Sequence, residues 1–189
     1  MTGDLGRDGP QVHARDILDF WFGLTPQQHF AKDDALDRMI ADRFAVLRAR
    51  VLADDANGWR DDPDTLLAAI ILLDQFSRNI GRGTPAAFEA DGLAARLTLA
   101  AIEKGWEDRY APSARIFLYM PLMHAEDRAI QDLSVARFDA LGVEENANFA
   151  RDHRDVLHRF GRFPGRNAAL GRQSSAEEQE WLQENGGGW

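Results

Sequence analysis

The stretch that decides the fold runs from Leu66 to Arg82 and reads LLAAIILLDQFSRNIGR. Its first eight residues, Leu66–Leu73, are all apolar, which suits a helix only when other helices surround it. Just upstream, Asp62-Pro63 supplies a capping side chain followed by proline at the first helical position. The stretch therefore predicts a central, buried helix whose second half carries a dense set of hydrogen-bonding side chains.

The whole chain is expected to be all-helical. Within Leu66–Leu73, the alanines and the absence of valine and threonine favour a helix over a buried strand. No stretch of the chain alternates between apolar and polar residues with a period of two, as a half-exposed strand would. Glycine and proline recur at short intervals, which predicts about eight helices joined by short turns and arranged in antiparallel pairs. The 189 residues suit a single domain.

The segment Pro85–Gly105 favours a particular helical arrangement. It has small residues at helix contact positions and ends in glycine, as a tetratricopeptide (TPR) helix pair does, although no repeat of about 34 residues is present. We therefore expect a TPR-like right-handed helical array, with a closed bundle as the alternative.

Turn and capping signals bound the expected helices. Thr25-Pro26 predicts a turn, and Pro121 is expected to kink or divide the helix that contains it. Ser174 and Ser175 each precede a glutamate by three residues, a capping-box signal for a last short helix. The expected helices are 13–22, 33–53, 63–80, 85–104, 112–141 with a kink or break, 146–160 and one from about residue 175. Residues 1–11 are expected to form a flexible leader, 12–184 the helical domain and 185–189 a flexible tail.

Composition excludes several classes of function. With 31 acidic and 22 basic residues the net charge is −9, so phosphate backbones and anionic lipid surfaces should repel the chain. We therefore expect neither a nucleic-acid nor a membrane partner. The absence of cysteine excludes disulfides, thiolate nucleophiles and cysteine-ligated metals. No transmembrane run or signal segment is present, so we expect a cytoplasmic protein. Nothing in the sequence points to a cofactor, and the oligomeric state stays open.

The first polar cluster lies at the end of the central helix. It consists of Asp74, Gln75, Arg78, Asn79 and Arg82. A spacing of four places Asp74, Arg78 and Arg82 in one row on the helix surface. One interpretation is an internal Asp74–Arg78 ion pair, with the amides holding neighbouring loops. The other is that the arginines face a cleft and bind a carboxylate or phosphate through two hydrogen bonds each.

The second polar cluster follows Pro121 and contains His124, Glu126 and Asp127. An imidazole next to carboxylates could supply a general base or two metal ligands. If a helix restarts after the proline, however, Glu126 and Asp127 are ordinary first-turn acids that the helix dipole favours.

The third polar cluster begins with two histidines and continues into an arginine-rich loop. His153 and His158 are five residues apart, which is poor spacing for a helical zinc site, so no metal site is expected. The loop residues are Arg159, Arg162, Arg166, Asn167 and Arg172. They either tie the loop to neighbouring helix ends or form an anion-binding wall.

Four motifs in the same order resemble the bacterial domain-of-unknown-function 924 family. They are FWFG at Phe20–Gly23, LDQFSRN at Leu73–Asn79, FLYMPLMHAED at Phe117–Asp127 and RFGRFPGRN at Arg159–Asn167. The resemblance extends from about residue 14 to residue 183. It implies an all-helical, TPR-like fold, and it brings no established activity, substrate or catalytic residue.

The chain departs from the family pattern at two positions. Ala125 stands where relatives tend to have serine, and Gly165 where they tend to have histidine, so a mechanism that needs either side chain is placed in doubt. The residues that match the pattern, and from which a site should be built, are Asp74, Arg78, Asn79, His124, Glu126, His153, Arg162, Arg166 and Asn167.

Three hypotheses follow. The leading one is a binding module in which Arg78, Arg82, Arg162 and Arg166 converge on a pocket for an anionic small molecule or an acidic peptide. The second is a hydrolase with His124 or His153 as general base, oriented by Glu126 or Asp127 or assisted by a divalent ion. The third is a structural scaffold that binds protein partners through a helix groove.

Overall fold

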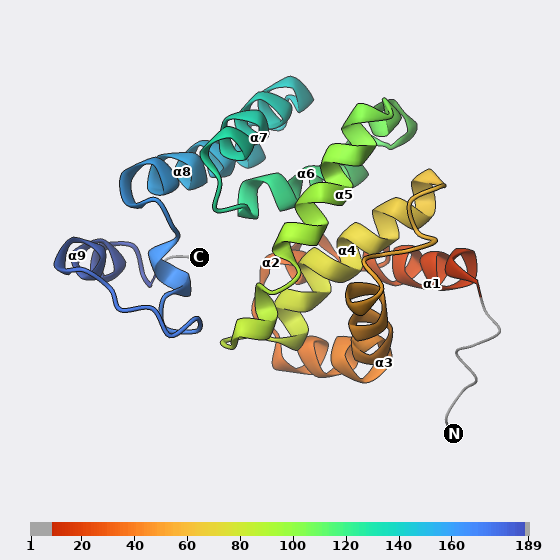
Figure 1. The fold of residues 1–189 in the computed structure, drawn as a ribbon, viewed down its shortest axis with the longest axis horizontal. Coiled ribbons are helices and arrows are strands. Elements are labelled where there is room, and N and C mark those ends of the chain that lie inside the picture. The colour runs from red at the N-terminus through yellow and green to blue at the C-terminus, as the bar shows by residue number, and fades with distance from the viewer. Residues whose placement is uncertain (1–8, 188–189) are drawn as a thin grey trace.

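The computed structural model describes residues 9–187 and is helical along most of that length (Figure 1). The α-helices are α1 (Pro10–Phe22), α2 (Pro26–Phe30), α3 (Asp34–Ala53), α4 (Pro63–Ile80), α5 (Asp91–Glu103), α6 (Pro112–His124), α7 (Arg128–Leu141), α8 (Glu144–Phe160) and α9 (Ala176–Glu184). Short 3-10 helices are η1 (Pro85–Ala87), η2 (Trp106–Arg109) and η3 (Pro164–Arg166). Between residues 9 and 187 there is no strand. The all-helical, single-domain prediction is therefore confirmed.

Helix α4 is the central element. Every residue from Thr65 to Ser77 is buried, because α1, α3, α5 and α6 pack around the helix. Its start is fixed by Asp62, whose carboxylate accepts hydrogen bonds from the backbone N–H groups of Asp64 and Thr65. Consecutive helices also pack against each other, α3 with α4, α5 with α6 and α7 with α8, which is compatible with the expected TPR-like array.

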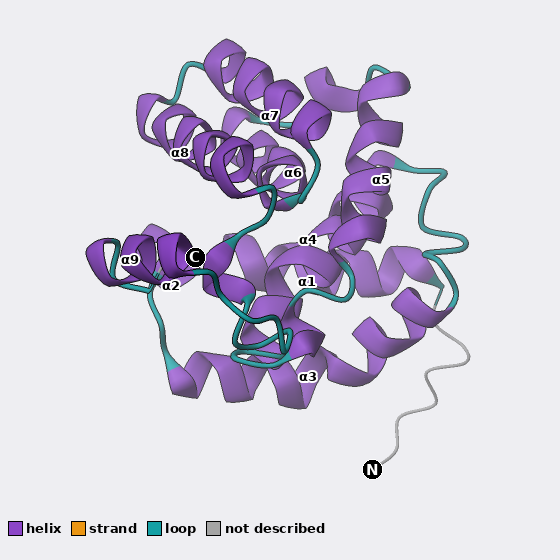
Figure 2. Ribbon diagram, turned by 60° about the vertical axis from the view of Figure 1, so that its left-hand side comes forward, coloured by secondary structure: helices purple, strands orange, loops and turns teal. Residues whose placement is uncertain are grey.

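A second, smaller core holds the C-terminal part of the chain. Val156, Leu157, Phe163 and Trp181 form it, and they join α8 and the following loop to α9. Helix α9 begins with the expected capping box, in which Ser175 and Glu178 satisfy each other's backbone N–H groups. Figure 2 shows α9 set apart from the α7–α8 pair, with the teal loop that carries η3 running between them. This loop brings Arg166 back towards α5 and α6.

Several boundaries differ from the sequence prediction. Helix α1 begins at Pro10, inside the expected leader, and residues 1–8 and 188–189 of the expected leader and tail lie outside the described residues. Thr25-Pro26 starts the short helix α2, because Thr25 and Gln28 form a capping box. The expected break in the stretch 112–141 is present, but it lies at residues 125–127 between α6 and α7, because α6 continues past Pro121 to His124.

The start of α5 differs for a steric reason. The turn after α4 is a 3-10 helix, and α5 begins only at Asp91. A Cβ at Gly81 would clash with the backbone of Ala86 and Ala87, so glycine at this position lets η1 pack directly on the end of α4. This close contact brings Asp91 over the polar end of α4.

Candidate functional site

The polar end of α4 is centred on a buried carboxylate. Asp74 has no exposed surface, and its oxygens lie 2.8 and 3.1 Å from Nδ1 of His124. Nε2 of Gln75 donates to the same carboxylate at 2.6 Å, and Nη1 of Arg78 lies 3.3 Å from it. A buried carboxylate with these partners is stable as an anion. The pKa of Asp74 accordingly lies far below its usual value: burial alone would raise it, but the charge of Arg78 and the contact with His124 outweigh burial.

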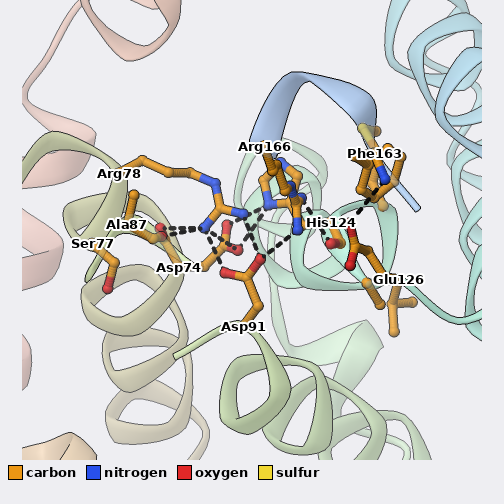
Figure 3. A network of polar contacts seen from close by, with 12 residues as sticks. Asp74, Ser77, Arg78, Ala87, Asp91, His124, Glu126, Phe163 and Arg166 are labelled. Atoms are coloured by element: carbon orange, nitrogen blue, oxygen red, sulfur yellow. Dashed lines mark hydrogen bonds and ion pairs between the residues drawn. The ribbon is translucent and has the colours of Figure 1, made fainter. Parts of the chain in front are cut away.

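A second carboxylate joins two arginines that lie far apart in the sequence. Asp91, at the start of α5, accepts hydrogen bonds from Nη1 and Nη2 of Arg78 at 2.9 and 3.0 Å. It also accepts one at 3.1 Å from Nη1 of Arg166, whose Nη2 donates to the backbone oxygen of His124 at 2.9 Å. Figure 3 shows these side chains meeting between α4, α5, the end of α6 and the η3 loop. We call Asp74, Arg78, Asp91, His124 and Arg166 the central network.

The end of α6 is held so that His124 faces the network. Gln131 of α7 is fully buried, and its Nε2 donates to the backbone oxygens of Met123 at 2.6 Å and Ala125 at 2.8 Å. These carbonyls lack helical partners because α6 ends at His124. Gln131 therefore fixes the backbone on both sides of His124, and Asp74 fixes its ring.

Charges within the central network nearly cancel. Two carboxylates face two guanidinium groups, and the imidazole is neutral at pH 7, because burial and the charge of Arg78 lower the pKa of His124 although Asp74 opposes this. Burial lowers the pKa of Arg166 to about 10, with Asp91 acting against that effect. The Arg166 guanidinium also lies over the rings of Phe88 and Phe163, at 4.8 and 4.5 Å from their centroids.

A groove of about 440 Å³ borders the central network. His124, Asp91 and Arg166 reach it from the network, and the rest of its wall comes from η1, α5, the α6–α7 connection and the chain after η3. The other lining residues are Pro85, Phe88, Glu89, Gly92, Ala95, Arg96, Leu99, Ala125, Glu126, Asp127, Ile130 and Leu170. Two larger hollows contain none of the predicted site residues. One is lined by residues between Gln27 and Ala35, and the other by Pro10, His13 and residues between Leu47 and Trp59. The groove is therefore the candidate site.

Only part of the predicted ligand-binding set gathers at the central network, and of that part only Arg166 lines the groove. Asp74, Gln75, Arg78 and Arg166 belong to the network or touch it. Arg82 and Asn79 instead bind Asp37 of α3, with Nε of Arg82 at 2.6 Å and Nδ2 of Asn79 at 2.8 Å from its oxygens. The expectation that four arginines converge on one pocket does not hold, since Arg82 points to α3 instead.

The arginine-rich loop is tied mainly to α9. Arg159 pairs with Glu177 at an exposed position. Arg162 makes two hydrogen bonds, at 2.7 and 2.8 Å, to the buried carboxylate of Glu178. Nδ2 of Asn167 donates to Oγ of Ser174 at 3.0 Å. Of the loop residues proposed for ligand binding, the structure brings only Arg166 to the groove.

The carboxylates after His124 do not orient its ring. Glu126 accepts from the backbone N–H of Phe163 at 2.8 Å and pairs with Arg172 through both oxygens. Asp127 caps α7, since its carboxylate accepts from the backbone N–H of Ile130 at 3.0 Å. The expectation that Glu126 or Asp127 orients His124 is therefore wrong; Asp74, fifty residues away in sequence, does so.

His153 is a buried neighbour of the network. Its Nδ1 lies 2.8 Å from the backbone oxygen of Phe149, and its ring centroid lies 6.2 Å from that of His124. Burial lowers the pKa of His153 to about 3. Within the part of the chain that the structure describes, no group of three or more histidines and carboxylates is arranged to hold a metal ion.

His153 should make the protein less stable as the pH falls from 7 to 5. The unfolded state takes up a proton near pH 6.5, whereas the folded state does so only near pH 3, so stability is complete above pH 6.5 and declines below it. At pH 5 this loss amounts to about 2 kcal/mol. In His153→Phe the difference in unfolding free energy between the two pH values, measured with urea, should shrink by about that amount.

A matched control lies on the same helix. His158 has an exposed side chain, and His158→Phe should keep the wild-type difference between pH 7 and pH 5. A wild-type difference in His153→Phe would show that His153 does not carry this pH dependence.

Sequence reasoning missed Asp91. It lay inside the expected helix 85–104, and nothing in the local sequence indicated that Arg78 and Arg166 would be its partners. The clue available was indirect: a buried row containing Arg78 needs a carboxylate in addition to Asp74.

Comparison with known proteins places the chain in a family. The sequence profile of a bacterial protein family of unknown function, DUF924, matches residues 17–186. The solved structure of the protein of unknown function ATU0120 from Agrobacterium tumefaciens is 37% identical in sequence and superimposes with a TM-score of 0.87, covering 92% of this chain and 98% of that one. No curated protein matches the chain. In residues 9–187 no helix is long and apolar enough to cross a membrane. The chain therefore belongs to the bacterial DUF924 family.

Proposed function

We propose that the groove beside the central network binds a small molecule with an apolar body and a single anionic or carbonyl oxygen. Apolar side chains from the η1–α5 connection, α5, α7 and the segment after η3 line the groove, including Phe88, Leu99, Ile130 and Leu170. Arg166 supplies a cation at the inner end. Ligand pockets commonly combine a largely apolar wall with a few polar groups in a volume of about 300–1,000 Å³.

The observation that carries the proposal is the incomplete neutralisation of Arg166. Its guanidinium is buried, yet its carboxylate partner, Asp91, is shared with Arg78. Burial without a full counter-charge is what lowers the pKa of Arg166 to about 10. An acceptor oxygen in the groove would supply the missing partner and would gain a charge-assisted hydrogen bond.

The charges around the groove favour a small molecule over an acidic peptide. Four carboxylates line the groove, those of Glu89, Asp91, Glu126 and Asp127, against the two guanidinium groups of Arg96 and Arg166. Several negative charges on a peptide would be repelled by them, whereas a single oxygen can approach Arg166 alone. We therefore expect monoanions and uncharged carbonyl compounds to bind better than dianions.

A thermal-shift titration tests the proposal. Hexanoate, hexanamide, benzoate and the dianion succinate are the probes, and we expect hexanoate to raise the melting temperature more than succinate does. At a ligand concentration of 100 times Kd the gain in unfolding free energy is about 2.7 kcal/mol.

A variant that fills the groove provides the decisive comparison. Gly92 is an exposed helical residue that lines the groove, and a Cβ there meets only the end of the Arg96 side chain. Gly92→Leu should fold normally and lose the hexanoate shift. Ala136→Leu, at an exposed position of α7 that does not line the groove, is the matched control and should keep it. The proposal fails if no probe shifts the wild type, or if Gly92→Leu responds as the wild type does.

A further inference from the structure

We infer that His124, positioned by Asp74, is a general base that gives the groove hydrolytic activity towards uncharged or monoanionic carboxylic esters. This inference rests on the proposed function, because the ester would occupy the same groove. To the proposed binding it adds a reaction, a class of substrate, and roles for His124 and Asp74.

The contacts of His124 leave its Nε2 available to accept a proton. A carboxylate can only accept, so the contact of Asp74 with Nδ1 places the proton on that atom and the lone pair on Nε2. Among the described residues Nε2 has no hydrogen-bond partner. The side chain is 16% exposed and lines the groove. Asp74 is itself held by Gln75 and Arg78, so the ring cannot turn without breaking several contacts.

The protonation state suits a base. The charged and titratable groups that face His124 are Asp74 and Arg78 from α4, Asp91 from α5, His153 from α8 and Arg166 from η3. Their combined effect with burial lowers the pKa of His124, so the imidazole is neutral and able to take a proton at pH 7.

Arg166 is placed to stabilise a developing negative charge. Its Nη2 donates to the backbone oxygen of His124 at 2.9 Å, so the guanidinium and the imidazole border the same part of the groove. A guanidinium has five N–H donors, and the hydrogen bonds that Arg166 makes to Asp91 and His124 leave others for an oxyanion.

Water is the nucleophile that this site can activate. The described residues that line the groove include no serine or threonine, and the chain has no cysteine. His124 Nε2 takes a proton from water while the water oxygen attacks the ester carbonyl carbon. The carbonyl π electrons move to oxygen, and the oxyanion faces Arg166. Collapse of the intermediate re-forms the carbonyl and breaks the bond to the alkoxide, which receives the proton from His124. One ester and one water give one acid and one alcohol.

The negative charge around the groove should favour carboxylic esters over phosphate esters as substrates. A phosphate monoester is largely dianionic at neutral pH and would meet the carboxylates of Glu89, Glu126 and Asp127. We therefore expect hydrolysis of p-nitrophenyl hexanoate and no hydrolysis of p-nitrophenyl phosphate.

The test compares the wild type with His124→Gln on p-nitrophenyl hexanoate. Removal of a general base should lower kcat/KM about 100-fold or more. His158→Gln is the matched control, because His158 is an exposed histidine outside the groove and reports the background of surface imidazoles. It should retain wild-type kcat/KM. Equal rates for the wild type and His124→Gln would overturn the inference, as would a burst of p-nitrophenol equal to the enzyme concentration, which signals a covalent acyl intermediate.

The role of Asp74 in positioning His124 is tested by the pH profile of kcat/KM, which a purely structural role would not shift. In Asp74→Asn the negative charge beside Nδ1 is lost, so the pH at which kcat/KM reaches half its maximum should fall relative to the wild type. An unchanged pH profile with a folded protein would remove Asp74 from the mechanism, and if Asp74→Asn does not fold, His124→Gln decides alone.

Hexanoate binding distinguishes a failure of the proposed hydrolysis from a failure of the proposed binding site. Binding without His124-dependent hydrolysis refutes the general base, whereas no binding to the wild type refutes the groove itself.

Discussion

Replacing Asp91 by alanine is expected to lower the free energy of unfolding by about 3–5 kcal/mol. Its carboxylate accepts three hydrogen bonds from two arginines, and its side chain is only 12% exposed. After the substitution Arg78 retains Asp74, but Arg166 keeps no carboxylate within hydrogen-bonding distance. The cost comes mainly from leaving a buried guanidinium without a counter-charge. Urea unfolding at pH 7 measures it directly.

Asp55→Asn is the surface control for Asp91→Ala, since Asp55 has a φ of 51°, a backbone conformation that asparagine tolerates better than alanine. Asp55 also pairs with two arginines, Arg60 and Arg96, but its side chain is 62% exposed. Water replaces the lost contacts at such a position, so the urea midpoint should change little. Similar losses in the two variants would mean that burial is not what makes the Asp91 pairs strong.

The near-zero charge of the central network explains why it can be both structural and open to a ligand. Pairing between Asp74, Asp91, Arg78 and Arg166 removes most of the cost of burying four charges. The pairing is uneven, however, because Arg78 contacts both carboxylates and Arg166 only one. The less compensated arginine is the one that borders the groove. Arg78 is therefore saturated by internal contacts, and the proposed ligand contact concerns Arg166 alone.

The central helix could be predicted from sequence because its cause is local. Eight apolar residues leave no exposed face, and Asp62-Pro63 fixes the start of the helix. Capping signals likewise predicted the start of α9 at Ser175. These features depend on neighbours in the chain, so the sequence itself contains the information.

The partners of the polar side chains were harder to predict because they depend on how the helices pack against one another. Helical spacing placed Arg82 in the row of Asp74 and Arg78, but α4 ends at Ile80, so the periodicity no longer applies to Arg82. That residue turns to Asp37 instead. His124 lies close to Glu126 and Asp127 in sequence, yet its helix ends at His124 itself, and both acids point elsewhere. Proximity along the chain was misleading at both positions.

Phe76→Ala is expected to cost about 3–5 kcal/mol of unfolding free energy while leaving the central network in place. Phe76 is fully buried among the rings of Phe20, Trp21 and Phe44, at centroid distances of 5.9, 5.6 and 4.8 Å. The substitution removes these contacts and leaves a cavity between α4 and the packed helices α1 and α3. The loss should appear as a lower urea midpoint.

Phe30→Ala makes the same chemical change at a surface position. Phe30 stacks on Phe117 but is 63% exposed, so its removal leaves no cavity and should cost much less than Phe76→Ala. Phe76 contacts α1 and α3, whereas Asp74, two residues earlier, contacts α6. Below its denaturation midpoint, Phe76→Ala should therefore hydrolyse p-nitrophenyl hexanoate at the wild-type rate. A parallel loss of stability and activity would instead mean that the packing of α1 and α3 sets the position of Asp74, and that core and groove act as one unit.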